Sequence, residues 1–153
     1  MGVDDRLSEL GIELPPVAAP VASYVPVVVS NGFAFVSGQV AMEEGEPLYR
    51  GRLGADVSLE DGAAAARRCA LQALAALKAE LGSLDRIARI VKLTVWVAST
   101  EDFTDQPKVA NGASDVLGEI FGDRGKHARA AVAAPALPLG VPVEVQVLAE
   151  VPG

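Results

Sequence analysis

The chain has 153 residues, half of them hydrophobic, and its 13 Lys and Arg against 20 Asp and Glu give a net charge of −7. This length predicts a single domain over residues 1–153, and the apolar content excludes a disordered chain. The negative balance opposes binding to a polyanion, and the basic residues cluster only at Arg67-Arg68 and between Arg124 and Arg129, so we expect no nucleic-acid partner.

The first segment predicts a short helix followed by an irregular lead. Leu7 to Leu10 fits a short helix, and Pro15-Pro16 and Pro20 come after it. Proline lacks a backbone donor and restricts the residue before it, so neither a helix nor a central strand is expected across these positions.

A β-hairpin is predicted next. Residues 24–30 and 33–37 have the composition of two strands, and Asn31-Gly32 between them accepts the positive φ angles of a tight turn. The acidic, glycine-rich stretch 43–54 is expected to be a loop with at most a short strand.

A long helix follows this loop. Ser58 can accept a hydrogen bond from a backbone N–H three residues on, as an N-cap does, and Gly82 suits the helix end. Helical spacing relates four apolar residues between them: Ala70, Leu74, Leu77 and Leu81.

The second half predicts a strand, a helix and two strands. β-Branched and aromatic residues over 87–97 favour a central strand, and Pro107 opens a helix that extends to about Phe121. Two strands, 128–134 and 141–151, complete the order ββ-α-β-α-ββ. This order predicts an α+β fold with two helices on one face of a mixed sheet, and self-association is the simplest way to cover the other face.

One arginine and one glutamate interrupt the apolar sequence of the last two strands. Arg129 presents a planar fork of donors that suits a carboxylate, and Glu144 follows after enough residues for a turn and a returning strand. The pair is expected to face one small pocket. The alternative is an internal salt bridge between neighbouring strands.

The pattern of motifs resembles the RidA/YjgF family, enamine/imine deaminases also known as L-PSP endoribonucleases or translation inhibitors. The resemblance covers most of the chain and includes the aromatic strand that ends in Ser37-Gly38-Gln39, the upstream Tyr24, and Leu137-Pro138 between Arg129 and Glu144. It implies a chorismate-mutase-like fold and a homotrimer with active sites in the clefts between subunits.

The resemblance also implies a chemistry. Such an enzyme hydrolyses a 2-imino acid or its enamine tautomer to a 2-keto acid and ammonia, without a metal or organic cofactor. Arg129 is then the receptor for the substrate carboxylate and Glu144 the base or the partner of the water. Tyr24, Ser37 and Gly38 are implied to contact the substrate, Gly38 by letting the backbone approach closely.

Several of these residues also have an ordinary structural interpretation. Ser37 and Gly38 suit a strand end and a bend, Tyr24 suits a strand aromatic, and a lone histidine such as His127 is more often structural than catalytic. Trp96 suits the core or an interface.

The chain departs from typical members of the family. They have Pro-Ala-Arg where this chain has His127-Ala128-Arg129, many have a cysteine at the position of Ala131, and an asparagine is usual where Glu101 stands. Residues 109–115, followed by Phe121-Gly122 and then His127-Ala128-Arg129, indicate a distinct subgroup. Its substrate stays open, and so does the alternative of a non-catalytic trimer that binds a small metabolite and regulates a partner; a ribonuclease is the least favoured function.

The cysteine and histidine content and the N-terminal sequence bear on disulfides, metal binding and cellular location. One cysteine excludes an intrachain disulfide, and one Cys with one His argues against a zinc site, so Cys69 is expected to be a buried structural thiol. The N-terminus shows no basic region followed by an apolar run, and no segment reaches transmembrane length. A cytoplasmic protein without a membrane partner is expected.

Overall fold

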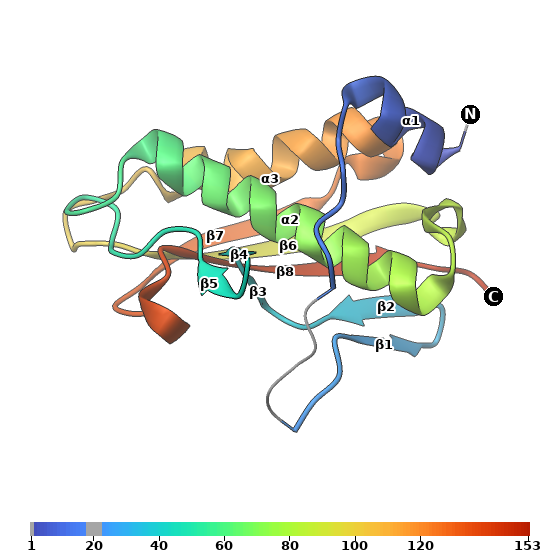
Figure 1. The fold of residues 1–153 in the computed structure, drawn as a ribbon, viewed down its shortest axis with the longest axis horizontal. Helices are drawn as coiled ribbons and strands as arrows, with labels where there is room; N and C mark the ends of the chain where they lie inside the picture. The colour runs from blue at the N-terminus through green and yellow to red at the C-terminus, as the bar shows by residue number, and fades with distance from the viewer. Residues whose placement is uncertain (1, 18–22) are drawn as a thin grey trace.

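The computed structural model describes residues 2–17 and 23–153, and Figure 1 shows a twisted main sheet with the helices on one of its sides and a small separate pair of strands, β4 and β5. Pro20 lies outside the described residues. The elements in chain order are α1 (Val3–Leu10), β1 (Val27–Ser30), β2 (Phe33–Val36), β3 (Gln39–Val40), β4 (Met42–Glu43), β5 (Glu46–Pro47), α2 (Leu59–Leu81), β6 (Arg89–Ala98), α3 (Gln106–Phe121), β7 (Ala128–Ala134) and β8 (Val143–Glu150). Three short 3-10 turns, η1 (Leu84–Arg86), η2 (Gly122–Gly125) and η3 (Pro138–Gly140), connect them.

The sheet is mixed, as predicted. Its order is β1-β2-β8-β6-β7, and β3 pairs with β8 beyond the end of β2. Only β6 and β7 run parallel, and the other pairs in this sheet are antiparallel. β7 is therefore an edge strand.

The predicted hairpin is confirmed, with a shorter first strand. Asn31 and Gly32 have φ angles of 52° and 80°, and Ser30 pairs with Phe33 around them, as in a two-residue turn. β1 begins at Val27 and not at Tyr24, because Pro26 has no N–H to donate to a ladder. The pairing of Gln39–Val40 with β8 was not predicted from the sequence.

Both long helices begin and end close to the predicted residues. The Ser58 hydroxyl oxygen accepts from the Asp61 N–H at 3.1 Å, and Gly82 at the end of α2 has a φ of 83°. The two helices cross closely at Gly112, where any Cβ would overlap the backbone carbonyl of Ala63. The glycine of the 109–115 motif thus serves the packing of the helices.

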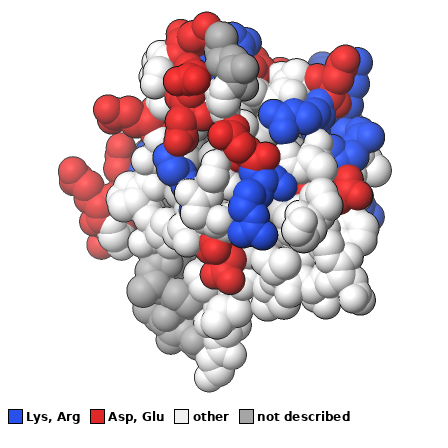
Figure 2. All heavy atoms as spheres, turned by 90° about the vertical axis from the view of Figure 1, so that its right-hand side faces the viewer, with Lys and Arg blue, Asp and Glu red and all other residues white. Residues whose placement is uncertain are grey.

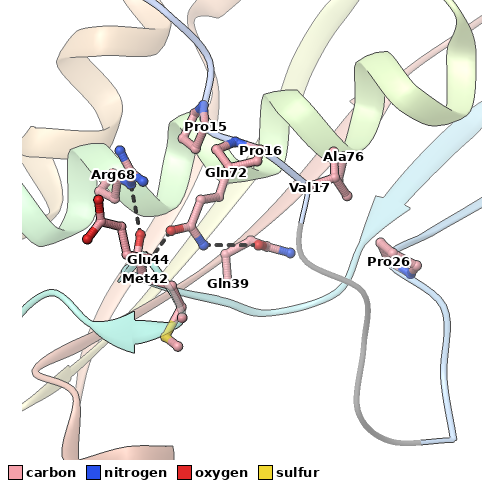
Figure 3. Close-up of a pocket in the computed structure, with 11 residues that line it drawn as sticks. Pro15, Pro16, Val17, Pro26, Gln39, Met42, Glu44, Arg68, Gln72 and Ala76 are labelled. Carbon is pink, nitrogen blue, oxygen red and sulfur yellow. Dashed lines mark hydrogen bonds between the residues drawn. The ribbon is translucent and has the colours of Figure 1, made fainter.

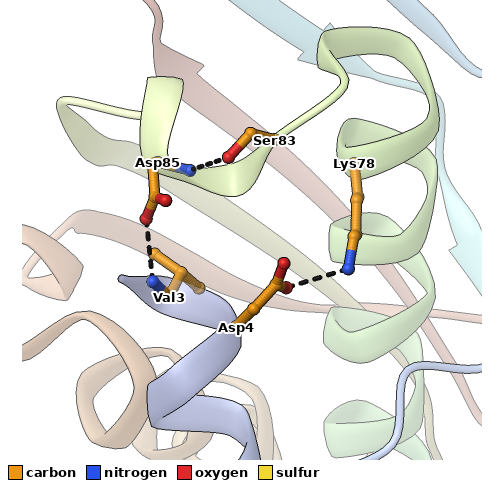
Figure 4. Close-up of polar contacts among 5 residues, drawn as sticks. All are labelled: Val3, Asp4, Lys78, Ser83 and Asp85. Carbon is orange, nitrogen blue, oxygen red and sulfur yellow. Dashed lines mark hydrogen bonds and ion pairs between the residues drawn. The ribbon is translucent and has the colours of Figure 1, made fainter. Parts of the chain in front are cut away.

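The N-terminal helix α1 is held by two polar contacts (Figure 4). The Asp85 carboxylate accepts from the Val3 N–H at 2.8 Å and so caps the helix from η1, and Lys78 pairs with Asp4 at 2.8 Å. α1 packs against α3 and η1, on the helical side of the sheet.

The opposite face of the sheet carries exposed apolar side chains. Strand alternation buries Val143, Val145 and Val147 under the helices and turns the residues between them to the other side. On that other face Val28, Phe35 and Val132 remain 51%, 46% and 43% exposed. Within the described residues no element covers this face, which we call the open face.

Candidate functional site

Arg129 lies on the edge strand and its side chain reaches α3. It pairs with Leu93 of β6, whose side chain is buried on the helical side. One terminal nitrogen, Nη1, donates to Asn111 Oδ1 at 2.8 Å and to Ser114 Oγ at 3.1 Å, and Nη2 donates to the Pro107 carbonyl at a longer 3.4 Å. All three acceptors are neutral, so the hydrogen bonds orient the guanidinium without neutralising its charge.

Glu144 lies on the other side of the sheet. It pairs with Trp96 across the β8–β6 ladder, and Trp96 pairs with Val132 across the β6–β7 ladder, so these side chains share the open face. Arg129 is an odd number of residues from Val132 on the same strand and therefore faces the opposite way. The prediction that Arg129 and Glu144 face one small pocket is therefore wrong for a single chain.

The salt-bridge interpretation is also contradicted. The ion pairs among the described residues join other side chains, and none includes Arg129 or Glu144. A guanidinium with no acidic partner and a carboxylate with no basic one are unusual when both are partly buried.

Gly38 and Glu144 do lie together, at the start of β3. A Cβ on Gly38 would overlap the Glu144 carboxylate, so only glycine leaves room for the acid in its observed position. Glu144 is half-buried, and its desolvation raises the pKa of the carboxyl above the ordinary value. A carboxylate with a raised pKa is a stronger base once it is ionised.

Ser37 and Tyr24 lie at the same end of β2. The Ser37 hydroxyl donates to the Val25 carbonyl at 2.6 Å, and its N–H donates to the Pro26 carbonyl at 2.8 Å. This serine therefore ties the lead into β1 to the end of β2. Tyr24, next to Val25 in the chain, is 54% exposed.

His127 contacts Ser114, one of the residues that hold Arg129. Its Nε2 lies 2.8 Å from Ser114 Oγ, and its Nδ1 lies 2.6 Å from the Gly125 carbonyl oxygen. Glu101, the other departure of the sequence from the resembled family, is an exposed residue of the turn after β6.

Comparison with known proteins decides the family. A family model described as "YjgF/chorismate_mutase-like, putative endoribonuclease" matches residues 4–151. The chain belongs to this YjgF family. Protein TCP17 of Trypanosoma cruzi is 47% identical over 146 residues, which are 95% of this chain and 91% of that protein.

Two solved structures have the same fold as this chain. A putative endoribonuclease from Shewanella oneidensis MR-1 is 38% identical, with a TM-score of 0.94 over 98% of this chain and 99% of that one. A protein of unknown function from Agrobacterium tumefaciens is 40% identical, with a TM-score of 0.88 over 97% of this chain and 91% of that one. The chorismate-mutase-like fold implied by the family resemblance is confirmed by the family model and these structures.

Gln72 is a residue of this YjgF chain that supports the site and that sequence reasoning missed (Figure 3). Its amide oxygen accepts from the Met42 N–H at 2.8 Å, and its amide nitrogen donates to the Val40 carbonyl at 2.8 Å. The side chain thus takes the place of a neighbouring strand along the free edge of β3, two residues after Gly38. A glutamine among the buried alanines and leucines of α2 was the available signal.

The two hydrogen bonds of Gln72 with Val40 and Met42 form what we call the clamp. A pocket of about 270 Å³ borders it. Figure 3 shows Arg68, which donates to the Met42 carbonyl at 3.1 Å, at one end of the pocket and Pro26 at the other, with Pro15 and Pro16 nearer to Arg68. The pocket is on the α2 side of the sheet, so it does not contain Glu144.

We expect Gln72→Met to lower the free energy of unfolding by about 2 kcal/mol, because it leaves the part-buried Val40 carbonyl and Met42 N–H without partners. Urea denaturation of the purified protein measures this change. Glu80→Met, on an exposed position of the same helix, is the matched control and should change stability by less than about 0.5 kcal/mol. Equal midpoints for both variants would contradict the clamp.

Three further findings concern sequence predictions. Cys69 is fully buried, as predicted, and this burial, followed by the charge of Glu144, raises the pKa of its thiol far above the ordinary value. No three His, Cys, Asp or Glu side chains of the described residues are grouped to hold a metal ion. None of the helices in the described ranges is long and apolar enough to cross a bilayer.

Proposed function

We propose that this YjgF protein hydrolyses 2-imino acids or related small carboxylate-bearing imines and enamines to keto acids and ammonia. One observation carries the proposal: Arg129 is oriented by three neutral acceptors and no ion pair of the described chain includes it. A fixed, uncompensated guanidinium at a partly exposed position is a receptor for an anion, and its planar fork suits a carboxylate.

The residues divide the reaction between them. Arg129 binds the substrate carboxylate and orients the C=N carbon, and Glu144 takes a proton from the attacking water. The C–O bond forms as the C=N π electrons move to nitrogen, and Glu144 passes the water proton to that nitrogen, which gives a carbinolamine. Glu144 then takes the hydroxyl proton and gives it to the same nitrogen, so that the C=O bond forms as the C–N bond breaks to release ammonia and the keto acid. Gly38 keeps space open beside the base.

Two copies of the chain are needed to complete this site. Arg129 and Glu144 face opposite sides of the sheet, so one substrate meets both only if they come from different subunits. The edge position of β7 and the apolar open face are the surfaces available for such an assembly. Together with the family resemblance, they support a homotrimer with intersubunit clefts.

The activity test is ammonia release from a freshly generated imino acid. We expect the wild-type protein to accelerate release over the spontaneous rate for small aliphatic substrates. A spontaneous rate in its presence, together with Arg129-dependent binding of the keto acid, would replace the enzyme with a non-catalytic metabolite-binding protein.

Subunit mixing tests where the two residues come from. The Arg129→Ala and Glu144→Gln oligomers should each be inactive. When the two are unfolded together in equal amounts and refolded, we expect about a quarter of the wild-type activity to return. The reason is that about one intersubunit site in four then combines an intact Arg129 with an intact Glu144. A variant carrying both changes on one chain, refolded with wild type, is the control for assembly. No recovery in the mixture, or a stable monomer by light scattering, would contradict a shared site.

RNA cleavage is the second candidate, because the family model and the Shewanella structure both carry the description "putative endoribonuclease". The net charge of −7 opposes binding to RNA, and Figure 2 shows basic side chains intermixed with acidic ones on the face that it views. We expect metal-free, repurified protein to leave RNA intact. Cleavage that is lost in Arg129→Ala would show instead that the site acts on RNA.

Gly38→Ala should reduce turnover more than stability. The added methyl displaces the Glu144 carboxylate, which is the far end of a flexible side chain and can move without unfolding β3. We expect kcat to fall about 10-fold or more, with a loss of unfolding free energy near about 1 kcal/mol. Gly118→Ala, where the new methyl meets nothing on α3, is the control in both assays.

A further inference from the structure

Two residues of the 109–127 region form a chain of hydrogen bonds that ends on Arg129. A carbonyl oxygen only accepts, so the 2.6 Å contact with the Gly125 carbonyl places a hydrogen on His127 Nδ1. In the neutral ring Nε2 is then an acceptor, and the Ser114 hydroxyl donates to it at 2.8 Å. With its hydrogen so directed, the Ser114 oxygen turns its lone pairs to Arg129 Nη1 at 3.1 Å.

This chain determines which edge of the guanidinium is left for a ligand. Asn111 Oδ1 and Ser114 Oγ together use both hydrogens of Nη1. Within the described ranges the hydrogen on Nε has no acceptor. The acceptor of Nη2 there is the Pro107 carbonyl, at the longer distance of 3.4 Å, so one of the two Nη2 hydrogens stays free. Nε and Nη2 form one side of the planar group, and that side accepts a carboxylate in the bidentate manner.

The geometry points to Ser114 and His127 as positioning residues, which orient Arg129 so that its Nε–Nη2 edge meets the substrate carboxylate. This inference rests on the proposed function, since it assigns these residues a role in the same site. Ser114 acts directly on Arg129, and His127 acts through Ser114 by orienting its hydroxyl. Neither residue contacts the reacting atoms.

The role is also distinct from that of an ordinary packing contact. Ser114 and Asn111 are three residues apart on α3 and so project from one side of the helix toward β7. His127 lies just before β7, two residues from Arg129. Removing the Ser114 hydroxyl should therefore release one of the two hydrogen bonds on Nη1 and leave the helix in place.

A double-mutant cycle tests the role, with 2-oxobutanoate as the binding probe and 2-iminobutanoate as the substrate. We expect Ser114→Ala to raise the Kd of 2-oxobutanoate and the KM of the substrate about 10-fold, with kcat changed less than about threefold. Ser114→Thr, which keeps a hydroxyl, should recover most of the affinity, and His127→Phe should weaken binding less than Ser114→Ala does. Glu119→Gln, an exposed neighbour on α3, is the control.

The decisive comparison is made in the Arg129→Ala background. If Ser114 acts through Arg129, Ser114→Ala adds no further loss of affinity there, whereas a purely structural role predicts the same loss in both backgrounds. If the wild type is active but Ser114→Ala loses the same affinity in both backgrounds, or loses none, the positioning role is overturned and the proposed function stands. A wild type that neither hydrolyses the imine nor binds 2-oxobutanoate removes the proposed function, and this role with it.

Discussion

Replacing Arg129 with Lys is expected to lower kcat/KM for imino-acid hydrolysis about 100-fold, because the positive charge stays but the planar pair of donors is lost. An ammonium group also cannot donate to Asn111 and Ser114 and still offer a two-point contact to a carboxylate. Arg129→Ala, which loses the charge as well, should cost about a further 10-fold. Coupled assay of ammonia release over a range of substrate concentrations measures both effects.

Stability separates this role from a structural one. The partners of Arg129 are three neutral acceptors on α3 and its first turn, so loss of the side chain should cost no more than about 1 to 2 kcal/mol of unfolding free energy. Arg67→Lys, on an exposed position of α2, is the matched control and should retain wild-type activity. Unchanged activity in Arg129→Lys and Arg129→Ala would remove the deaminase proposal.

The second large effect is expected for Glu144→Gln, which should lower kcat about 100-fold or more and leave the binding of a keto acid largely intact. The amide retains the shape of the side chain and its capacity for hydrogen bonds, but it cannot take a proton from water. Single-turnover rates and the Kd of 2-oxobutanoate separate the two steps. A large rise in Kd with normal kcat would show that Glu144 binds the substrate and does not serve the water.

The raised pKa of Glu144 adds a pH signature. Ionisation makes it a base, so kcat should rise with pH through a value above the ordinary glutamate pKa, and this dependence should disappear in Glu144→Gln. The folded protein holds the proton more tightly than the unfolded chain does. Ionisation of Glu144 therefore lowers stability, increasingly as pH rises from the ordinary pKa through the raised one.

Thermal unfolding checks this sign. Glu144→Gln should unfold at the same temperature as wild type or a higher one at pH 8, and the difference should shrink below the ordinary glutamate pKa. A residue that served only as half of a salt bridge would behave in the opposite way, because its removal would lower the unfolding temperature at neutral pH.

The elements of the fold could be predicted from the sequence because each depends on neighbouring residues. Asn31-Gly32 makes its own turn through two positive φ angles, and Ser58 caps α2 through a donor three residues away. Such signals need no knowledge of distant contacts. Individual candidates for the site, Arg129 and Glu144 among them, also stood out locally as charges within apolar strands.

How those candidates are arranged was decided by pairing between distant segments. The face on which Arg129 lies relative to Glu144 depends on the register of two ladders, β8–β6 and β6–β7, and a shift of one residue in either would reverse it. The acceptors of Arg129 lie 15 to 22 residues away in the chain, and the strand that Gln72 holds lies about 30 residues from it. Sequence alone therefore determined which residues carry charge and where the chain turns. Only the tertiary structure put Arg129 and Glu144 on opposite faces of the sheet and brought Ser114 and His127 into the hydrogen-bond chain that ends on Arg129. The reason is that strand register and helix packing are set by the whole core at once.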